Sequence, residues 1–208
     1  EQDSIGIEDL AANDIEAISF IYNIPLWLIN LWIREFGRDK TEDLCAWFNE
    51  QPKLTARINT ILIDIPQCLS LLNEQGWDVT QDTNYKDIIY INSHRGSLEK
   101  SEAFIKGYIT FMDKASMLVA RLVNPKPGER ILDCCAAPGG KSMYMATLMD
   151  NVGSLMSCDI HEHKIELMNS NAERLGASIV HTKVQDATKL PDSWNSYFDR
   201  VLVDAPCS

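Results

Sequence analysis

The residues with the clearest capacity for chemistry form a short turn of small side chains. The sequence reads Asp-Cys-Cys-Ala-Ala-Pro-Gly-Gly-Lys-Ser at positions 133–142, after the apolar run 130–132 and before a helix-like run. A strand, a tight turn and a helix N-terminus in this order make a cradle for a cofactor. Gly139 and Gly140 allow special backbone angles and close approach of a ligand. The turn is neither the G-x-G-x-x-G pattern of dinucleotide sites nor a nucleoside-triphosphate loop, because only one glycine precedes Gly140-Lys141-Ser142.

A second reactive fragment, Asp-Ala-Pro-Cys-Ser, occupies positions 204–208 and ends another apolar strand. It places the carboxylate of Asp204 three residues before the thiol of Cys207. A thiolate is an effective nucleophile and can form a covalent intermediate with a substrate. The residues alone therefore make Cys207 the candidate nucleophile and Asp204 a candidate catalytic neighbour.

Aspartates follow the ends of the predicted strands in the second half of the chain. They are Asp133, Asp159, Asp186 and Asp204. Because the carboxyl ends of parallel strands meet at one edge of a sheet, four such carboxylates favour a ligand-binding edge over four unrelated turns or helix caps. Asp159 ends the second strand, about 20 residues past the glycine turn, where a carboxylate typically binds the hydroxyls of a ribose.

Alternating strands and helices must position these residues. The pattern predicts strands at 131–134, 155–158, 179–182 and 201–203, and helices at 141–149 and 161–175. Such alternation indicates a parallel sheet with helices on both faces, in a domain introduced by the turn at 124–129.

The first half of the chain has a different organisation. Residues 8–50 have helical spacing, and residues 53–99 form a small α+β unit with strands near 54–62, 79–83 and 87–92 and a helix at 66–75. Residues 100–123 are predicted as mostly helical or connecting. The predicted domains are a helical N-terminal segment, 1–52, a small α+β domain, 53–99, and an α/β domain with its leading helix, 100–208.

Composition limits the class of protein. The chain has 208 residues, 45% apolar and 24% charged, which is typical of a globular protein. Its longest apolar run, Ile24–Ile33, is shorter than the roughly 20 residues of a membrane span, so no membrane is expected. The six cysteines form no C-x-x-C pair, and His161 and His163 are interpreted as a surface pair, so no metal is expected. Free thiols favour a reducing cytosol.

The net charge of −11 argues against a nucleic-acid partner, but the charge is uneven. Residues 84–130 carry a net charge of +3, which is weak evidence for a surface that faces phosphates.

The motifs together resemble those of the RNA cytosine-C5 methyltransferase family, in particular enzymes of bacterial 16S ribosomal RNA. The resemblance rests on residues 133–142, the Asp-Ala-Pro-Cys end at 204–207 and Arg57-Ile58-Asn59, and it covers most of the chain. It implies a Rossmann-like methyltransferase domain that is truncated in its C-terminal half, and identifies 53–99 as the RNA-binding domain.

The resemblance also implies a cofactor, S-adenosyl-L-methionine, and a cytosine in RNA, expected to be 16S ribosomal RNA, as substrate. In the family, Asp159 would bind the ribose of the cofactor, Asp186 would lie near the adenine, and Asp204 would lie between cofactor and target base. The segment that wraps the methionine end of the cofactor corresponds to Cys135, Ala136, Ala137, Pro138, Gly139, Gly140 and Lys141.

The resemblance changes the role of Cys207. It implies that a cysteine in a downstream Thr-Cys motif is the nucleophile and that Cys207 assists release of the product. No Thr-Cys occurs in the sequence, so the chain is expected to be an inactive fragment. The alternatives are a non-catalytic module that binds S-adenosylmethionine or RNA, and a DNA cytosine-C5 methyltransferase that uses Cys207 directly. No oligomeric state is predicted.

Overall fold

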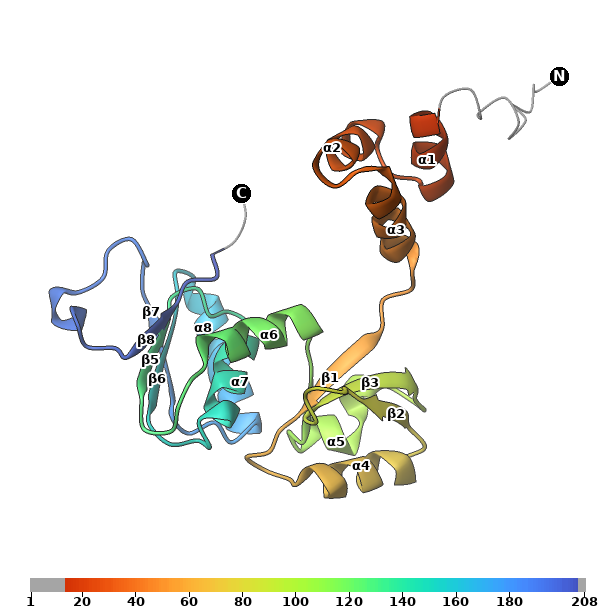
Figure 1. Ribbon diagram of the computed structural model, residues 1–208. Coiled ribbons are helices and arrows are strands. Elements are labelled where there is room, and N and C mark those ends of the chain that lie inside the picture. Colours follow the sequence, from red (N-terminus) through yellow and green to blue (C-terminus); the bar gives the residue numbers. More distant parts are fainter. Residues whose placement is uncertain (1–13, 206–208) are drawn as a thin grey trace. The chain divides into compact units, whose positions relative to one another are not determined.

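A computed structural model describes residues 14–205 and divides the chain into two compact units, 1–52 and 53–208. Candidate Cys207 lies outside the described residues. The first unit contains three helices, α1 (Asp14–Tyr22), α2 (Leu26–Phe36) and α3 (Arg38–Asn49) (Figure 1). Their small core is made by Ile18, Ile29 and Cys45. No single described helix is long and apolar enough to cross a membrane, although α1 and α2 meet that criterion as a pair bent by 117°.

The second unit begins with an antiparallel sheet in the order β2-β3-β1-β4. Its strands are β1 (Leu54–Ile58), β2 (Asp78–Gln81), β3 (Ile88–Ser93) and β4 (Ile109–Phe111), and its helices are α4 (Ile65–Glu74), the 3-10 turn η2 (Leu98–Lys100) and α5 (Glu102–Ile105). Strand β4 was not expected, since residues 100–123 lack a long alternating pattern. It pairs with β1, so this sheet continues beyond residue 99.

Successive side chains of β1 point to opposite faces of the sheet, and each face contacts a different part of the unit. Ala56 and Ile58 point to one face and pack with α4 and α5 in a cluster that includes Leu72 and Ala103. Arg57, between them, points to the opposite face, where it bonds to Thr147.

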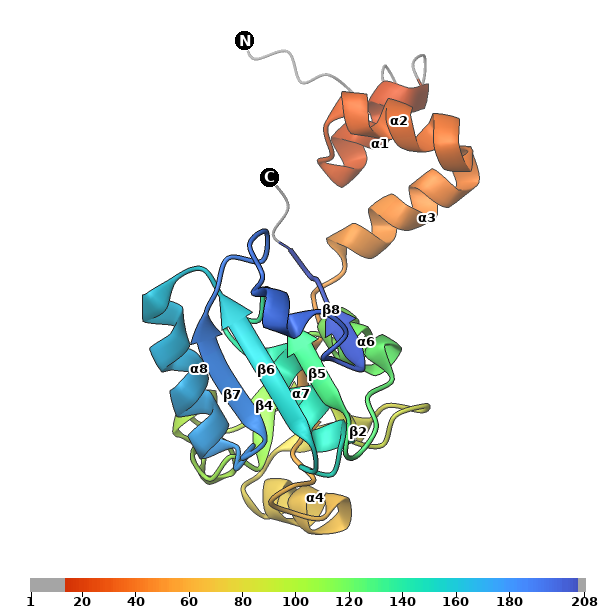
Figure 2. The same ribbon diagram turned by 90° about the vertical axis from the view of Figure 1, so that its left-hand side faces the viewer.

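The remaining residues form a parallel sheet in the order β7-β6-β5-β8 (Figure 2). Its strands are β5 (Arg130–Asp133), β6 (Ser154–Asp159), β7 (Val180–Val184) and β8 (Arg200–Leu202), and its helices are α6 (Lys114–Val123), α7 (Gly140–Leu148), α8 (Glu162–Arg174) and the 3-10 turn η3 (Asp192–Trp194). The alternation of strands and helices therefore predicted the α/β fold correctly.

The prediction of helices on both faces was wrong for the described residues. Figure 1 shows α6, α7 and α8 on one side of the parallel sheet and the segment between β7 and β8 on the other. That segment covers the second face with Trp194 and Phe198, whose rings meet edge to face 5.3 Å apart and pack on Leu132 and Cys158. Two aromatic side chains thus supply apolar cover at the place where a helix was expected.

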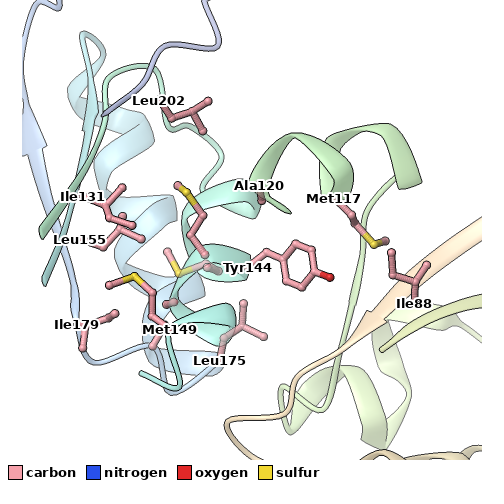
Figure 3. Close-up of a cluster of buried hydrophobic side chains, with 14 residues drawn as sticks. Ile88, Met117, Ala120, Ile131, Tyr144, Met149, Leu155, Leu175, Ile179 and Leu202 are labelled. Atoms are coloured by element: carbon pink, nitrogen blue, oxygen red, sulfur yellow. The ribbon is translucent and has the colours of Figure 1, made fainter. Parts of the chain in front are cut away.

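One hydrophobic cluster joins the two sheets of the second unit (Figure 3). Tyr144 of α7 and Met117 of α6 are fully buried and lie between the parallel sheet and Ile88 of β3. The two sheets therefore share a core, which fixes the small sheet beside α6 and α7.

Candidate functional site

Asp133 ends β5 inside the protein, with 1% of its surface exposed. Its Oδ2 accepts a hydrogen bond of 2.7 Å from the Ser142 hydroxyl, which accepts one of 2.8 Å from Ser157 on β6. Burial raises the pKa of Asp133 to about 6, while the bond from Ser142 and the nearby Cys135 amide favour the ionised form. These hydrogen bonds connect the start of α7 with the ends of β5 and β6, so Asp133 helps to position the turn.

The turn itself depends on its glycines. Gly139 has a φ of 98° and caps α7, and a Cβ placed there would lie 3.3 Å from side-chain atoms of Met143 and Met168. The Ala136 amide donates to the Cys158 carbonyl at 2.8 Å, and this bond holds the turn against β6. The turn therefore presents backbone, without bulky side chains, at the positive end of a nine-residue helix.

Asp159 ends β6 and is 7% exposed. Its Oδ1 accepts from the His161 amide at 3.0 Å and lies 3.7 Å from the Lys164 ammonium. Its Oδ2 makes no hydrogen bond or ion pair with any residue in 14–205, so it can accept from a ligand hydroxyl. This geometry fits the predicted ribose-binding carboxylate.

Asp204 follows β8 and pairs with Lys141 in the first turn of α7, with 2.6 Å between Nζ and Oδ2. Both side chains are partly exposed, so solvent screens the pair. The sequence did not predict this contact, which connects the two motifs directly.

Three of the predicted carboxylates lie at one edge of the parallel sheet. Asp133 and Asp159 end the neighbouring strands β5 and β6, and Asp204 follows β8 on the other side of β5. Burial raises the pKa of the Cys135 thiol in the turn after β5, and the charges of Asp133, Asp159 and Asp204 raise it further.

Asp186 behaves differently from the other three. It follows β7, and its carboxylate accepts from the Thr188 amide and hydroxyl at 2.9 and 2.7 Å. These bonds lower its pKa. The carboxylate closes a local turn and also lies 3.5 Å from the Lys189 ammonium.

Sequence reasoning missed how the site is supported. Ser142 was noted only as the last residue of the motif, and Ser157 carries no pattern of its own. Their shared role follows from the strand pairing that brings β5 and β6 together. Among residues 14–205, no three histidine, cysteine or acidic side chains are arranged to hold a metal ion.

Comparisons with known proteins show which families this chain is similar to. Residues 120–208 match the family described as 16S rRNA methyltransferase RsmB/F. Residues 24–96 match the ferredoxin-like domain of RsmF/B-like methyltransferases, a match that begins within the helical unit rather than at β1.

Individual relatives carry related names. The chain is 39% identical over 185 residues to a probable ribosomal RNA small subunit methyltransferase B of Bacillus subtilis, covering 88% of this chain and 41% of that protein. It is 39% identical over 112 residues to a tRNA (cytosine(72)-C(5))-methyltransferase of Pyrococcus horikoshii, covering 54% and 28%. The chain thus spans less than half the length of both relatives.

A solved structure has the same fold. The crystal structure of a methyltransferase homologue from Pyrococcus horikoshii superposes with a TM-score of 0.81 at 24% identity, over 94% of this chain and 64% of that one.

Proposed function

The chain belongs to the RNA cytosine-C5 methyltransferase family close to RsmB, and from this premise we propose that the protein methylates carbon 5 of a cytosine in ribosomal RNA. S-adenosyl-L-methionine is the methyl donor of this family. The RNA is proposed to be 16S ribosomal RNA in the cytoplasm, with the small antiparallel sheet contributing to its binding.

The observation that carries the proposal is the group of carboxylates at one edge of the parallel sheet, where Asp133 and Asp159 end neighbouring strands and Asp204 pairs with Lys141. This edge lies beside a turn that exposes backbone at a helix N-terminus. Residues 135–141 would hold the methionine end of the cofactor, the open oxygen of Asp159 would accept from the ribose, and Asp186 would lie near the adenine.

The proposed reaction requires a cysteine thiolate. When bound, S-adenosylmethionine supplies an electrophilic methyl group. Carbon 5 of cytosine is a poor nucleophile until a thiolate adds to carbon 6. Once carbon 5 has taken the methyl group, loss of its proton restores the ring double bond and releases the thiolate. Asp204 would hold the amino edge of the cytosine, with Lys141 fixing its carboxylate. A Thr-Cys cysteine outside residues 1–208 would be the nucleophile, and Cys207 would assist product release.

A direct binding experiment tests the cofactor site. Titration calorimetry of residues 1–208 with S-adenosylmethionine should show that Asp159→Asn weakens binding at least tenfold, about 1.4 kcal/mol. Asparagine keeps an oxygen for the His161 amide, so the fold should persist. The exposed Asp192→Asn is the matched control. Equal binding by both variants and the wild type would contradict the assignment of Asp159.

The reaction is tested with labelled methyl groups. Residues 1–208 should bind the cofactor but transfer no label to ribosomal RNA, while the longer protein with its Thr-Cys should yield 5-methylcytosine after digestion. Labelled RNA produced by residues 1–208 would instead make Cys207 sufficient as the nucleophile. Transfer to DNA alone would favour a DNA methyltransferase.

A further inference from the structure

A cavity of about 260 Å³ lies between the small antiparallel sheet and the glycine turn. We call it the junction cavity. It is lined by η2, α5 and β4 on one side, and by residues 138–140, α7 and the end of α8 on the other. None of Asp133, Asp159 and Asp204 lines it. It is therefore separate from the carboxylate edge, although Gly139 and Gly140 border both.

A polar atom without a partner belongs to the lining of this cavity. Thr110 lines the cavity, and its buried hydroxyl lacks a hydrogen bond among the described residues. Arg57 lies directly opposite Thr110 on β1, outside the lining, and two of its buried nitrogens also lack a hydrogen bond. Buried polar groups are nearly always hydrogen-bonded, so the open hydroxyl of Thr110 indicates a site that receives a polar atom from elsewhere.

Positive charge accompanies these open groups. Arg174 lines the cavity, donates one hydrogen bond of 2.8 Å to the Phe104 carbonyl, and forms no ion pair with a carboxylate among residues 14–205. Arg57, outside the lining, is fully buried, and burial lowers its pKa to about 10 although Tyr144 and Asp87 favour its charged form. The incompletely paired guanidinium of Arg174 at the cavity favours an anionic ligand.

Aromatic side chains also line the cavity. The rings of Phe104 and Phe111 stack 5.4 Å apart, and the Arg174 guanidinium lies 4.2 Å from the centre of the Phe104 ring. Aromatic rings and guanidinium planes are the surfaces on which unpaired nucleobases stack. The volume suits one small ligand and excludes a double strand.

These observations fit a ligand with a flat polar ring and a phosphate. We propose that the junction cavity binds one unpaired nucleotide of the RNA substrate, distinct from the base that is methylated. Its base packs against Phe104 and Phe111 and bonds to the Thr110 hydroxyl, and its phosphate pairs with Arg174. The inference rests on the proposed function, because it assumes an RNA substrate, and it gives the small sheet a specific part in holding that RNA beside the cofactor turn.

The test uses Thr110→Val, which removes the open hydroxyl and keeps the shape of the side chain. Fluorescence anisotropy of residues 1–208 with a short labelled single-stranded RNA should show binding about fivefold weaker than wild type. The melting temperature should stay the same or rise, because an unpaired buried hydroxyl costs stability. A merely structural role for Thr110 predicts a lower melting temperature instead.

Arg174→Gln should weaken RNA binding about tenfold, since it removes a charged partner of phosphate. Lys86→Gln makes the same charge change at an exposed position outside the cavity lining and should weaken binding less than about twofold. Cytidine monophosphate should compete with the RNA better than inorganic phosphate does.

Wild-type RNA affinity in Thr110→Val, or equal competition by phosphate and the nucleotide, would overturn the inference. If RNA affinity falls equally in the Lys86 and Arg174 variants, the loss is explained by overall charge, and the inference is overturned as well. Calorimetry with S-adenosylmethionine on the same samples separates the two claims. If cofactor binding is intact but the RNA tests contradict the junction cavity, the proposed function still holds. If the wild-type protein does not bind the cofactor, the proposed function itself is contradicted.

Discussion

Replacing Asp133 by asparagine should change how the stability of the protein depends on pH. The pKa of this carboxyl rises from 3.8 to about 6 in the folded protein, chiefly because it is buried. A raised carboxyl pKa means that the folded protein binds more protons than the unfolded chain between these two values. Stability is therefore lost as pH rises from about 4 to about 6, and the loss is complete above that window.

The size of the effect follows from the shift. About two pKa units, at 1.36 kcal/mol each, correspond to about 3 kcal/mol. Only 1% of the side chain is exposed, so solvent screening does not reduce this value much. The asparagine of the variant does not titrate and keeps the size of the side chain beside Ser142. The free energy of unfolding of the variant, relative to wild type, should therefore increase by about 3 kcal/mol between about pH 4 and pH 7.

Urea unfolding, followed by circular dichroism at several pH values without cofactor, measures this difference. Carboxylates other than Asp133 contribute equally to both proteins and cancel in the subtraction. Asp192→Asn, at an exposed position, should give a difference that is independent of pH. A constant difference between Asp133→Asn and wild type across the window would refute the reasoning, because it would place the pKa of Asp133 near its ordinary value.

Three further changes have definite expected outcomes. Gly139→Ala should lower stability by about 1–2 kcal/mol, because residue 139 has a left-handed backbone conformation. It should also weaken S-adenosylmethionine binding in calorimetry, because the added Cβ would lie 3.3 Å from two methionine side chains. The control is Gly96→Ala, which has a similar φ of 73° but no such neighbour and should leave binding unchanged. Asn59→Ala should cost about 2–4 kcal/mol in urea unfolding, since two buried carbonyls lose their donor. Asp82→Asn should lower the melting temperature at neutral pH but not at low pH. Hydrogen bonds, of which the one from Lys114 has the largest effect, hold the pKa of Asp82 far below its usual range. The stabilisation that they give is lost as the pH falls.

Local patterns predicted the catalytic half of the fold well. Strands β5 and β6 end at an aspartate, and in β7 and β8 an aspartate follows two residues after the strand; apolar runs bounded by turns are typical of buried parallel strands. Strand β4 escaped prediction because it has three residues, Ile109–Phe111, too few for a periodic pattern. The missing helix on the second face could not be foreseen either, because η3 is only three residues long and Trp194 and Phe198 cover the sheet from irregular backbone.

The positions of candidate site residues were predictable where the residues belong to a recognisable sequence motif or end a predicted strand. The turn at 135–141 and the carboxylates of Asp159 and Asp204 lie where the motifs suggested, although what they bind stays a prediction. The bonds that join distant segments were not predictable, because Arg57 meets Thr147 across 90 positions of sequence. Asp186 shows the converse limit. Its position just beyond a strand resembles that of the other aspartates, but its hydrogen bonds close a local turn.

The central claim is that the edge around Cys135 binds S-adenosylmethionine, and amide chemical shifts test it most directly. Titration of isotope-labelled residues 1–208 with the cofactor should move the signals of residues 135–141 and of Asp159 most, and those of the helical unit least. Large shifts confined to other parts of the chain, or no shifts in a folded protein at saturating cofactor, would contradict the account.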